Sequence, residues 1–300
     1  MHLRWSEDHA IAAANFALRR FRECGIAIPP GSRLPEARAC ISRNRERGAV
    51  QPAQYVLLSE QILEAHRSIM ELYLVACALD GRTDSFATVV PAALGGSLLA
   101  RHDSTSAGRN FQFEVFTAAV LRLAGIGGVT LAEPDIRIAA GDTHVGIAAK
   151  RIRSFAGRKR EQHLHKAVEQ LRLQGLGGYV FLNLDSVVSD AFLADGHSTA
   201  KLLLSNLTER AHEYILRVQA RDLARGIYGF AEGVFGFATL LGWDASASPA
   251  NLTLDVSCYG AVGVPTEGQE SFLRFLAGRG EYLTVRLREL IQRLEEDFFA

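Results

Sequence analysis

The chain has 300 residues, of which 48% are apolar, and its formal net charge at pH 7 is zero. This apolar content suits one large or two modest domains, and the zero net charge excludes a protein uniformly coated in positive charge. No apolar run reaches the ~18 residues that a membrane span needs, and the start MHLRWSEDHA carries acids where a signal peptide has its apolar segment. We therefore expect a cytoplasmic protein without membrane contact. The four scattered cysteines lack CxxC spacing, which argues against a zinc site or a disulfide framework.

The first hundred residues have the apolar spacing of helices. Residues 6–24, 34–47 and 53–79 each predict a helix, and 83–100 predict at most two short ones because Pro91 interrupts the pattern. The polar run 101–110 is the best candidate for a domain boundary. We therefore expect an all-helical region, 1–100, that serves regulation, dimerisation or docking of a protein partner.

Helical and strand patterns alternate in residues 101–300, which we expect to form the second domain. The order is helix 110–125, strands 133–138 and 144–152, helix 158–175 and a buried strand within 177–187. A long helix at 198–225, two strands within 227–243 and 251–260, and a closing helix at 271–299 follow. The sequence thus predicts an α/β fold with a mixed central sheet.

The stretch EPDIRIAAGDTHVGIAAKRI predicts a hairpin that joins an acid to a base. A turn near Gly141 brings Asp135 close to position 149, and the period of two places Lys150 on the same face as Ala148. A carboxylate there can hold Mg²⁺, and an ammonium beside it can orient or deprotonate a water molecule. One carboxylate binds magnesium weakly, so a second acid is required.

Glu114 is the candidate for that second acid. It lies within the otherwise apolar FQFEVF, on the helix before the hairpin, and burying an unpaired carboxylate there is costly. The alternative is that Glu114 faces solvent or pairs with Arg109 or Arg122.

These segments together resemble a known family. GRNFQFEVFTAAVLRLAG, EPDIRI, GIAAKRI, a basic helix and the strand GYVFLNL follow one another as in the core of the PD-(D/E)XK nuclease superfamily, which has the restriction-endonuclease-like fold. The resemblance covers about residues 109–185 and excludes the helical first third. It implies a metal-dependent phosphodiesterase core in which Asp135 matches the aspartate of PD, Lys150 the motif lysine and Glu114 the helix acid seen in many members.

Ala148 departs from this family pattern, which has Asp or Glu at the position. The chain is an inactivated variant, a natural degenerate member that binds nucleic acid without cutting it, or a protein in which Glu114, Glu133 or Asp142 completes the metal shell. We expect the chain as written to cleave poorly or not at all.

A basic run follows the hairpin. KRIRSFAGRKREQHLHK has seven Lys or Arg residues against one Glu, which suits a polyanionic partner bound through its phosphates. The alternative is a solvated helix face. The expected nucleic-acid contacts are Arg151, Arg153, Arg158, Lys159, Arg160, Lys166 and Gln170.

The sequence and the resemblance together predict a DNA endonuclease that uses Mg²⁺ or Mn²⁺. Asp135 and Glu114 are the expected metal ligands, Lys150 positions the nucleophile, and position 148 is the missing ligand. DNA as the substrate and a homodimer that cuts both strands come from the resemblance alone. The rivals are a nuclease-fold protein that binds nucleic acid or a protein without cleavage, and an adaptor whose basic run is only solvated.

Overall fold

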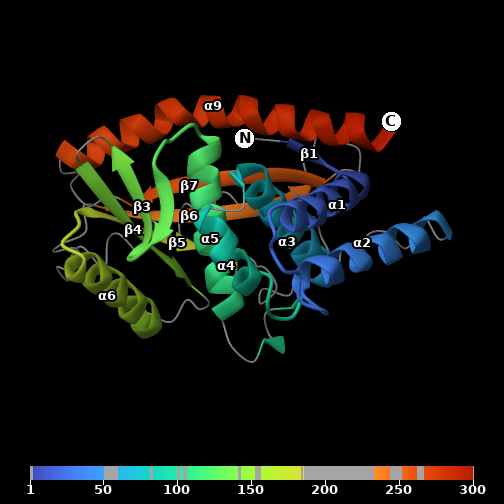
Figure 1. Ribbon diagram of the computed structural model, residues 1–300, viewed down its shortest axis with the longest axis horizontal. Coiled ribbons are helices and arrows are strands. Elements are labelled where there is room, and N and C mark those ends of the chain that lie inside the picture. Colours follow the sequence, from blue (N-terminus) through green and yellow to red (C-terminus); the bar gives the residue numbers. More distant parts are fainter. Residues whose placement is uncertain are drawn as a thin grey trace.

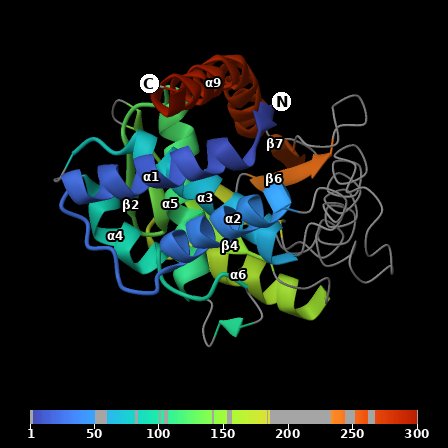
Figure 2. The same ribbon diagram turned by 90° about the vertical axis from the view of Figure 1, so that its right-hand side faces the viewer.

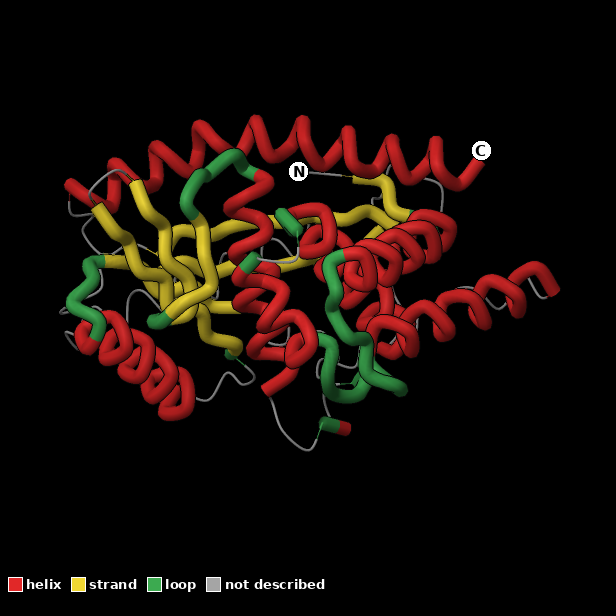
Figure 3. Tube along the Cα trace, in the orientation of Figure 1, coloured by secondary structure: helices red, strands yellow, loops and turns green. Residues whose placement is uncertain are grey.

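A computed structural model describes residues 3–50, 60–81, 84–99, 102–103, 107–140, 143–152, 157–183, 185, 233–243, 252–261 and 267–299. Helices surround a single mixed sheet in these residues (Figures 1 and 3). The described helices are α1 Glu7–Glu23, α2 Arg33–Val50, α3 Glu60–Ala78, α4 Ser85–Ala93, α5 Ala107–Leu123, α6 Gly157–Leu173 and α9 Glu267–Phe299. The strands are β1 Leu3–Trp5, β2 Val129–Ala132, β3 Asp135–Ala140, β4 Thr143–Arg151, β5 Gly178–Asn183, β6 Gly233–Trp243 and β7 Leu252–Ala261.

The seven strands lie in the order β1-β7-β6-β5-β4-β3-β2. β4, β5 and β6 are parallel neighbours, and the remaining pairs, β2 with β3, β3 with β4, β6 with β7 and β1 with β7, are antiparallel. Strands β4 and β5 approach closely where two glycines meet, since a Cβ added to Gly178 would lie 1.9 Å from the Gly146 carbonyl oxygen. The parallel β4–β5 pair is joined through α6, as a crossover connection requires.

The side chains of β4 and β5 point alternately to the two faces of the sheet, and each face carries its own layer of buried residues. Ile147, Ala149 and Phe181 belong to the main hydrophobic core, together with residues of α1, α3, α5 and α9. Ala148, Val180 and Leu182 alternate with these residues and are also buried, but they lie outside that cluster, on the sheet face that α6 covers. The apolar residues of this second layer are Ala148, Ile152, Leu164, Ala167, Leu171, Val180 and Leu182.

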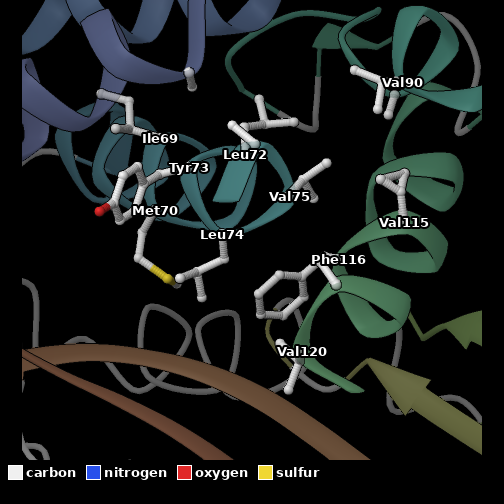
Figure 4. Close-up of a cluster of buried hydrophobic side chains, with 14 of the residues drawn as sticks. Ile69, Met70, Leu72, Tyr73, Leu74, Val75, Val90, Val115, Phe116 and Val120 are labelled. Atoms are coloured by element: carbon white, nitrogen blue, oxygen red, sulfur yellow. The ribbon is translucent and has the colours of Figure 1, made fainter. Parts of the chain in front are cut away.

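The helical region and the sheet share the main core. α3 and α5 pack against each other through residues such as Leu72, Val75 and Phe116 (Figure 4). β1 adds to the far edge of the sheet beside β7, and its Trp5 donates an indole hydrogen bond of 3.2 Å to His66 Nδ1 on α3. The domain boundary near residue 100 stays a prediction. The described residues before and after it share one hydrophobic core.

α9 runs along one long side of the molecule, from the β2–β4 end of the sheet to α1 (Figures 1 and 2). Near its middle, Tyr282 lies against Gly125 at the end of α5, and near its end Glu295 accepts a 3.0 Å hydrogen bond from His9 of α1. Tyr73 of α3 donates a 2.8 Å hydrogen bond to the Leu290 carbonyl. α9 therefore binds the helical region to the rest of the chain.

The predicted α/β class with a helical N-terminal region is confirmed, with two corrections. The first region is not all-helical, because Leu3–Trp5 form β1. Residues 129–132, between the predicted helix and the first predicted strand, form an additional strand, β2, which pairs with β3 in the first hairpin. The strands predicted near the C-terminus are present as β6 and β7. The helix predicted at 198–225 lies outside the described residues.

Within the described residues, none of the helices combines the length and apolar character needed to cross a membrane.

Two phenylalanines of one helix test the core assignment. Phe116 is fully buried in the main core, whereas Phe111, on the same helix, is 37% exposed. Phe116→Ala should lower the free energy of unfolding by about 3–5 kcal/mol because it opens a cavity. Phe111→Ala should change it by less than about 1 kcal/mol. Urea denaturation followed by circular dichroism measures both, and equal losses would contradict this placement of α5.

Candidate functional site

An ion pair joins the two strands of the predicted hairpin. Asp135 is the first residue of β3, and Lys150 is the second-last residue of β4. Ile136 pairs with Ile147, so Asp135 lies beside Ala148. Its Oδ2 atom accepts hydrogen bonds from Lys150 Nζ at 2.6 Å and from the backbone N–H of Ala149 at 2.7 Å. Asp135 and Lys150 therefore form an ion pair, and the predicted proximity of the acid and the base is confirmed.

Gln170 brings α6 to the same carboxylate. Its Nε2 donates to the Pro134 carbonyl at 3.1 Å and lies 3.5 Å from Asp135 Oδ1. The helix thus holds the start of β3 against the sheet, on the face that also carries Lys150. The predicted contact of Gln170 with nucleic acid stays a prediction. Its described contacts are with Pro134 and Asp135.

Glu114 is the third member of the group. Burial, followed by the negative charge of Asp135, raises the pKa of the Glu114 carboxyl to about 8, with a smaller contribution from Glu133 and an opposing one from Lys150. Glu114 therefore shares one electrostatic environment with Asp135 and Lys150. It has no hydrogen bond to any described residue, unlike Asp135.

The alternative partners proposed for Glu114 are engaged elsewhere. Arg109 pairs with Asp103 at 2.7 Å and with Glu64 at 3.0 Å. Arg122 pairs with Asp84 at the start of α4. The structure thus leaves Glu114 as an unpaired, half-buried carboxyl within the described part of the chain.

Burial also raises the pKa of Asp135, while Lys150 and the Ala149 N–H act in the opposite direction. The site thus holds two acids that each resist ionisation, next to one lysine. A bound cation would favour the charged form of both acids.

Ala148 is fully buried between the sheet and α6. It follows Gly146 and precedes Lys150 on one face of β4, and a Cβ added to Gly146 would contact Leu171 of α6 at 2.8 Å. The α6 face is therefore closely packed here. A carboxylate at position 148 would lie beside Asp135, and it would have to replace part of this apolar layer.

The two acids match the protein contribution to a magnesium site. Mg²⁺ commonly takes one or two carboxylates and completes its shell with waters and substrate phosphate oxygens. Glu114 and Asp135 supply two, and the unpaired Glu114 has a pKa that a divalent cation would lower. No group of three or more His, Cys, Asp or Glu side chains is arranged to hold a metal among the described residues. The residues present therefore fit a metal that is shared with substrate rather than one fully enclosed by protein.

Lysine is rare in this chain. Only four of the 33 Lys and Arg residues are lysines, and three of them, at 150, 159 and 166, lie in the hairpin and in α6. An arginine would keep the ion pair with Asp135, but it would not act as a base because its guanidinium does not deprotonate in proteins. The use of lysine at position 150 therefore suits a role in proton transfer.

The predicted phosphate contacts are only partly described. Lys166 is exposed on α6, as expected. Arg153 lies outside the described residues, as do the side chains of Arg158, Lys159 and Arg160 in the first turn of α6.

Arg151 corrects a prediction, because it is buried and turned away from Lys150. Its charge interacts with Arg109, Glu64, Asp185 and Glu71, and burial lowers its pKa. It is therefore not an exposed phosphate contact.

Arg151 belongs to a buried polar cluster that the sequence analysis missed. Gln112 of α5 donates to Glu71 of α3 at 2.5 Å, and Asn183 of β5 donates to Asp185 at 2.7 Å. Burial and the charge of Asp185 raise the pKa of Glu71 to about 7. Glu64, Arg67 and Glu71 recur within the apolar α3 sequence, and that spacing was the available signal. The cluster joins the helical region to the carboxyl ends of β4 and β5.

Comparisons with protein-family models, with curated proteins and with solved structures found no match for this chain.

The raised pKa of Glu114 predicts a pH-dependent stability. Between its unfolded pKa near 4.5 and about 8, the folded state keeps a proton that the unfolded state has lost, so this contribution declines as pH rises through that window. Glu114→Gln removes the effect. The variant should gain stability relative to the unsubstituted protein between pH 5 and pH 8, by about 1 kcal/mol or more at pH 8.

Urea denaturation at a series of pH values measures this difference. Glu281→Gln, an exposed position on α9, is the matched control and should show no such trend. A difference for Glu114→Gln that stays constant with pH would contradict the burial of an unpaired acid.

Proposed function

We propose that this protein is a metal-dependent DNA endonuclease of the PD-(D/E)XK type, with a restriction-endonuclease-like core and impaired cleavage. The observation that carries the proposal is the convergence of Asp135, Lys150 and Glu114 on one site. These residues come from three elements, β3, β4 and α5, and they are the ones that the family resemblance singled out. The order α5, β2, β3, β4, α6, β5 supports the proposed core.

Each residue of the site has a separate task. Glu114 and Asp135 would hold Mg²⁺ or Mn²⁺, which when bound polarises a phosphodiester and activates water. Lys150 places a positive charge and a proton-exchanging amine beside the scissile phosphate, where negative charge develops during hydrolysis. Gln170 and the Ala149 N–H hold Asp135 in position. Lys166 and the basic start of α6 attract the backbone of the nucleic acid.

Ala148 is the reason to expect weak cleavage. Without a carboxylate at this position, the protein contributes two acids rather than three, and the metal is held less firmly. The complete burial of Ala148 in an apolar layer favours a second candidate function, which is binding of nucleic acid without cleavage. Homodimer formation and docking of a protein partner through residues 1–100 remain predictions.

Restoring an acid at position 148 tests the proposed enzyme. Ala148→Glu should raise Mg²⁺-dependent nicking of a supercoiled plasmid by about a hundredfold, since a well-held metal stabilises developing charge by several kcal/mol. Adding Asp135→Asn to this variant should abolish the gain. Ala148→Gln is the control of equal size, and it should cleave no faster than the unsubstituted protein.

Thermal unfolding shows whether these variants are folded, and Ala148→Asp is a smaller substitute where Glu disrupts the layer. Folded variants with an acid at 148 that never cleave, while the unsubstituted protein also never cleaves, would reject the endonuclease and leave the binding function.

Salt dependence tests the nucleic-acid partner. Lys166→Ala should reduce the slope of log K against log salt concentration by about 1, because one phosphate contact and its released counterion are lost. Arg288→Ala, an exposed substitution on α9, should leave the slope unchanged. Fluorescence anisotropy of labelled DNA across a salt series gives both slopes. Binding that does not respond to salt would contradict DNA as the partner.

A further inference from the structure

Between Ala107 and Leu121, only one face of α5 reaches solvent, and only near the start of the helix. Along the first turns the accessible positions are Ala107, Gly108, Asn110, Phe111 and Glu114. From Val115 to Leu121 every residue is buried. The accessible stripe therefore ends at Glu114, in the candidate site.

Phe111 is the unusual member of this stripe. It is one of five large apolar side chains that are exposed in the described part of the chain. The others are Leu173, Phe275, Tyr282 and Val285. Among these five, Phe111 is the one on the accessible face of α5. The exposed part of its ring does not pack against the core.

The helix geometry places this ring next to the candidate site. Residues three apart on a helix are neighbours, with Cβ atoms about 5–6 Å apart. Long helical side chains also lean toward the N-terminus of the helix, so the Glu114 side chain extends over the turn that carries Phe111. The ring and the carboxyl therefore lie within the span of one nucleotide.

The chemistry of the ring indicates what it contacts. An accessible aromatic face stacks on any nucleobase, because every base has a π face. Within a duplex both faces of a base are covered by its neighbours, so only an unpaired, splayed or terminal base can stack on a protein ring. Besides Glu114, the accessible stripe carries no charge that would bind a phosphate instead.

We propose that Phe111 is a substrate-selecting residue that stacks on an unpaired nucleobase adjacent to the phosphate held at Asp135 and Lys150. This inference rests on the proposed function, because it takes a nucleic acid to be the ligand of that site. It goes further by naming the substrate class: single strands, frayed ends or distorted duplexes in preference to intact duplex DNA.

Binding to oligonucleotides without divalent metal tests the proposal independently of cleavage. Phe111→Leu should weaken binding of a single-stranded oligonucleotide about tenfold and leave binding of the matched blunt, intact duplex unchanged. Phe111→Tyr, which keeps an aromatic face, should retain the affinity. Phe275→Leu is the matched control, because Phe275 is a similarly exposed ring, at 41%, on α9. Circular dichroism confirms that each variant is folded.

An abasic site moved along the oligonucleotide locates the contact. The unsubstituted protein should lose affinity at one position of the abasic site, and Phe111→Leu should show no loss at that position because the ring is already gone. Equal loss in both proteins, or unchanged single-strand binding by Phe111→Leu, would overturn the stacking role while leaving the proposed nuclease intact. Failure of the unsubstituted protein to bind any DNA would overturn the proposed function and this inference together.

Discussion

The register between β3 and β4 is the constraint on which the site depends. Pairing of Ile136 with Ile147 sends both isoleucines into the main core and puts Asp135, Ala148 and Lys150 on the other face. A shift of one residue would bury the lysine in the core and expose the isoleucines, so the apolar pattern that stabilises the sheet also fixes the acid beside the base. The ion pair is thus a product of the same pairing that forms the core.

The polar cluster behind β4 gives the helical region a direct connection to this strand. Lys150 and Arg151 are consecutive, and they point to opposite faces of the sheet. Lys150 meets Asp135, whereas Arg151 enters a buried group of charges that includes Glu64 and Glu71 of α3. Buried charges are costly to leave unpaired, so a shift of α3 would weaken the charge interactions of Arg151 at the end of β4. α3 is therefore structurally linked to the candidate site.

The hairpin, its paired acid and base, and the position of Glu114 near them could be predicted because each has a local signature. Alternation gave the faces, Pro134 marked the strand start, and a lone acid in an apolar helix was conspicuous. The burial of Arg151 was also within reach, because the same period of two places it on the apolar face with Ile147 and Ala149. Arg151 also stands in a basic run, which indicated an exposed position.

Other features had no local signature. β1 is three residues long and exists because β7 supplies its partner, so its pattern is too short to read. The placement of α9 across both regions, and the close packing of Ala148 under α6, arise from tertiary contacts between distant segments. Sequence patterns describe the faces of single elements, and they do not say which faces meet.

The pairing of β1 with β7 has a consequence for how the chain acquires its structure. Trp5 is buried, and its strand partner Leu252 lies far later in the sequence. β1 therefore cannot pair until β7 has been synthesised, whereas its indole can already contact His66 of α3. Contacts of such long range slow folding, so we expect the pairing of β1 with β7 to be a late step in forming the sheet.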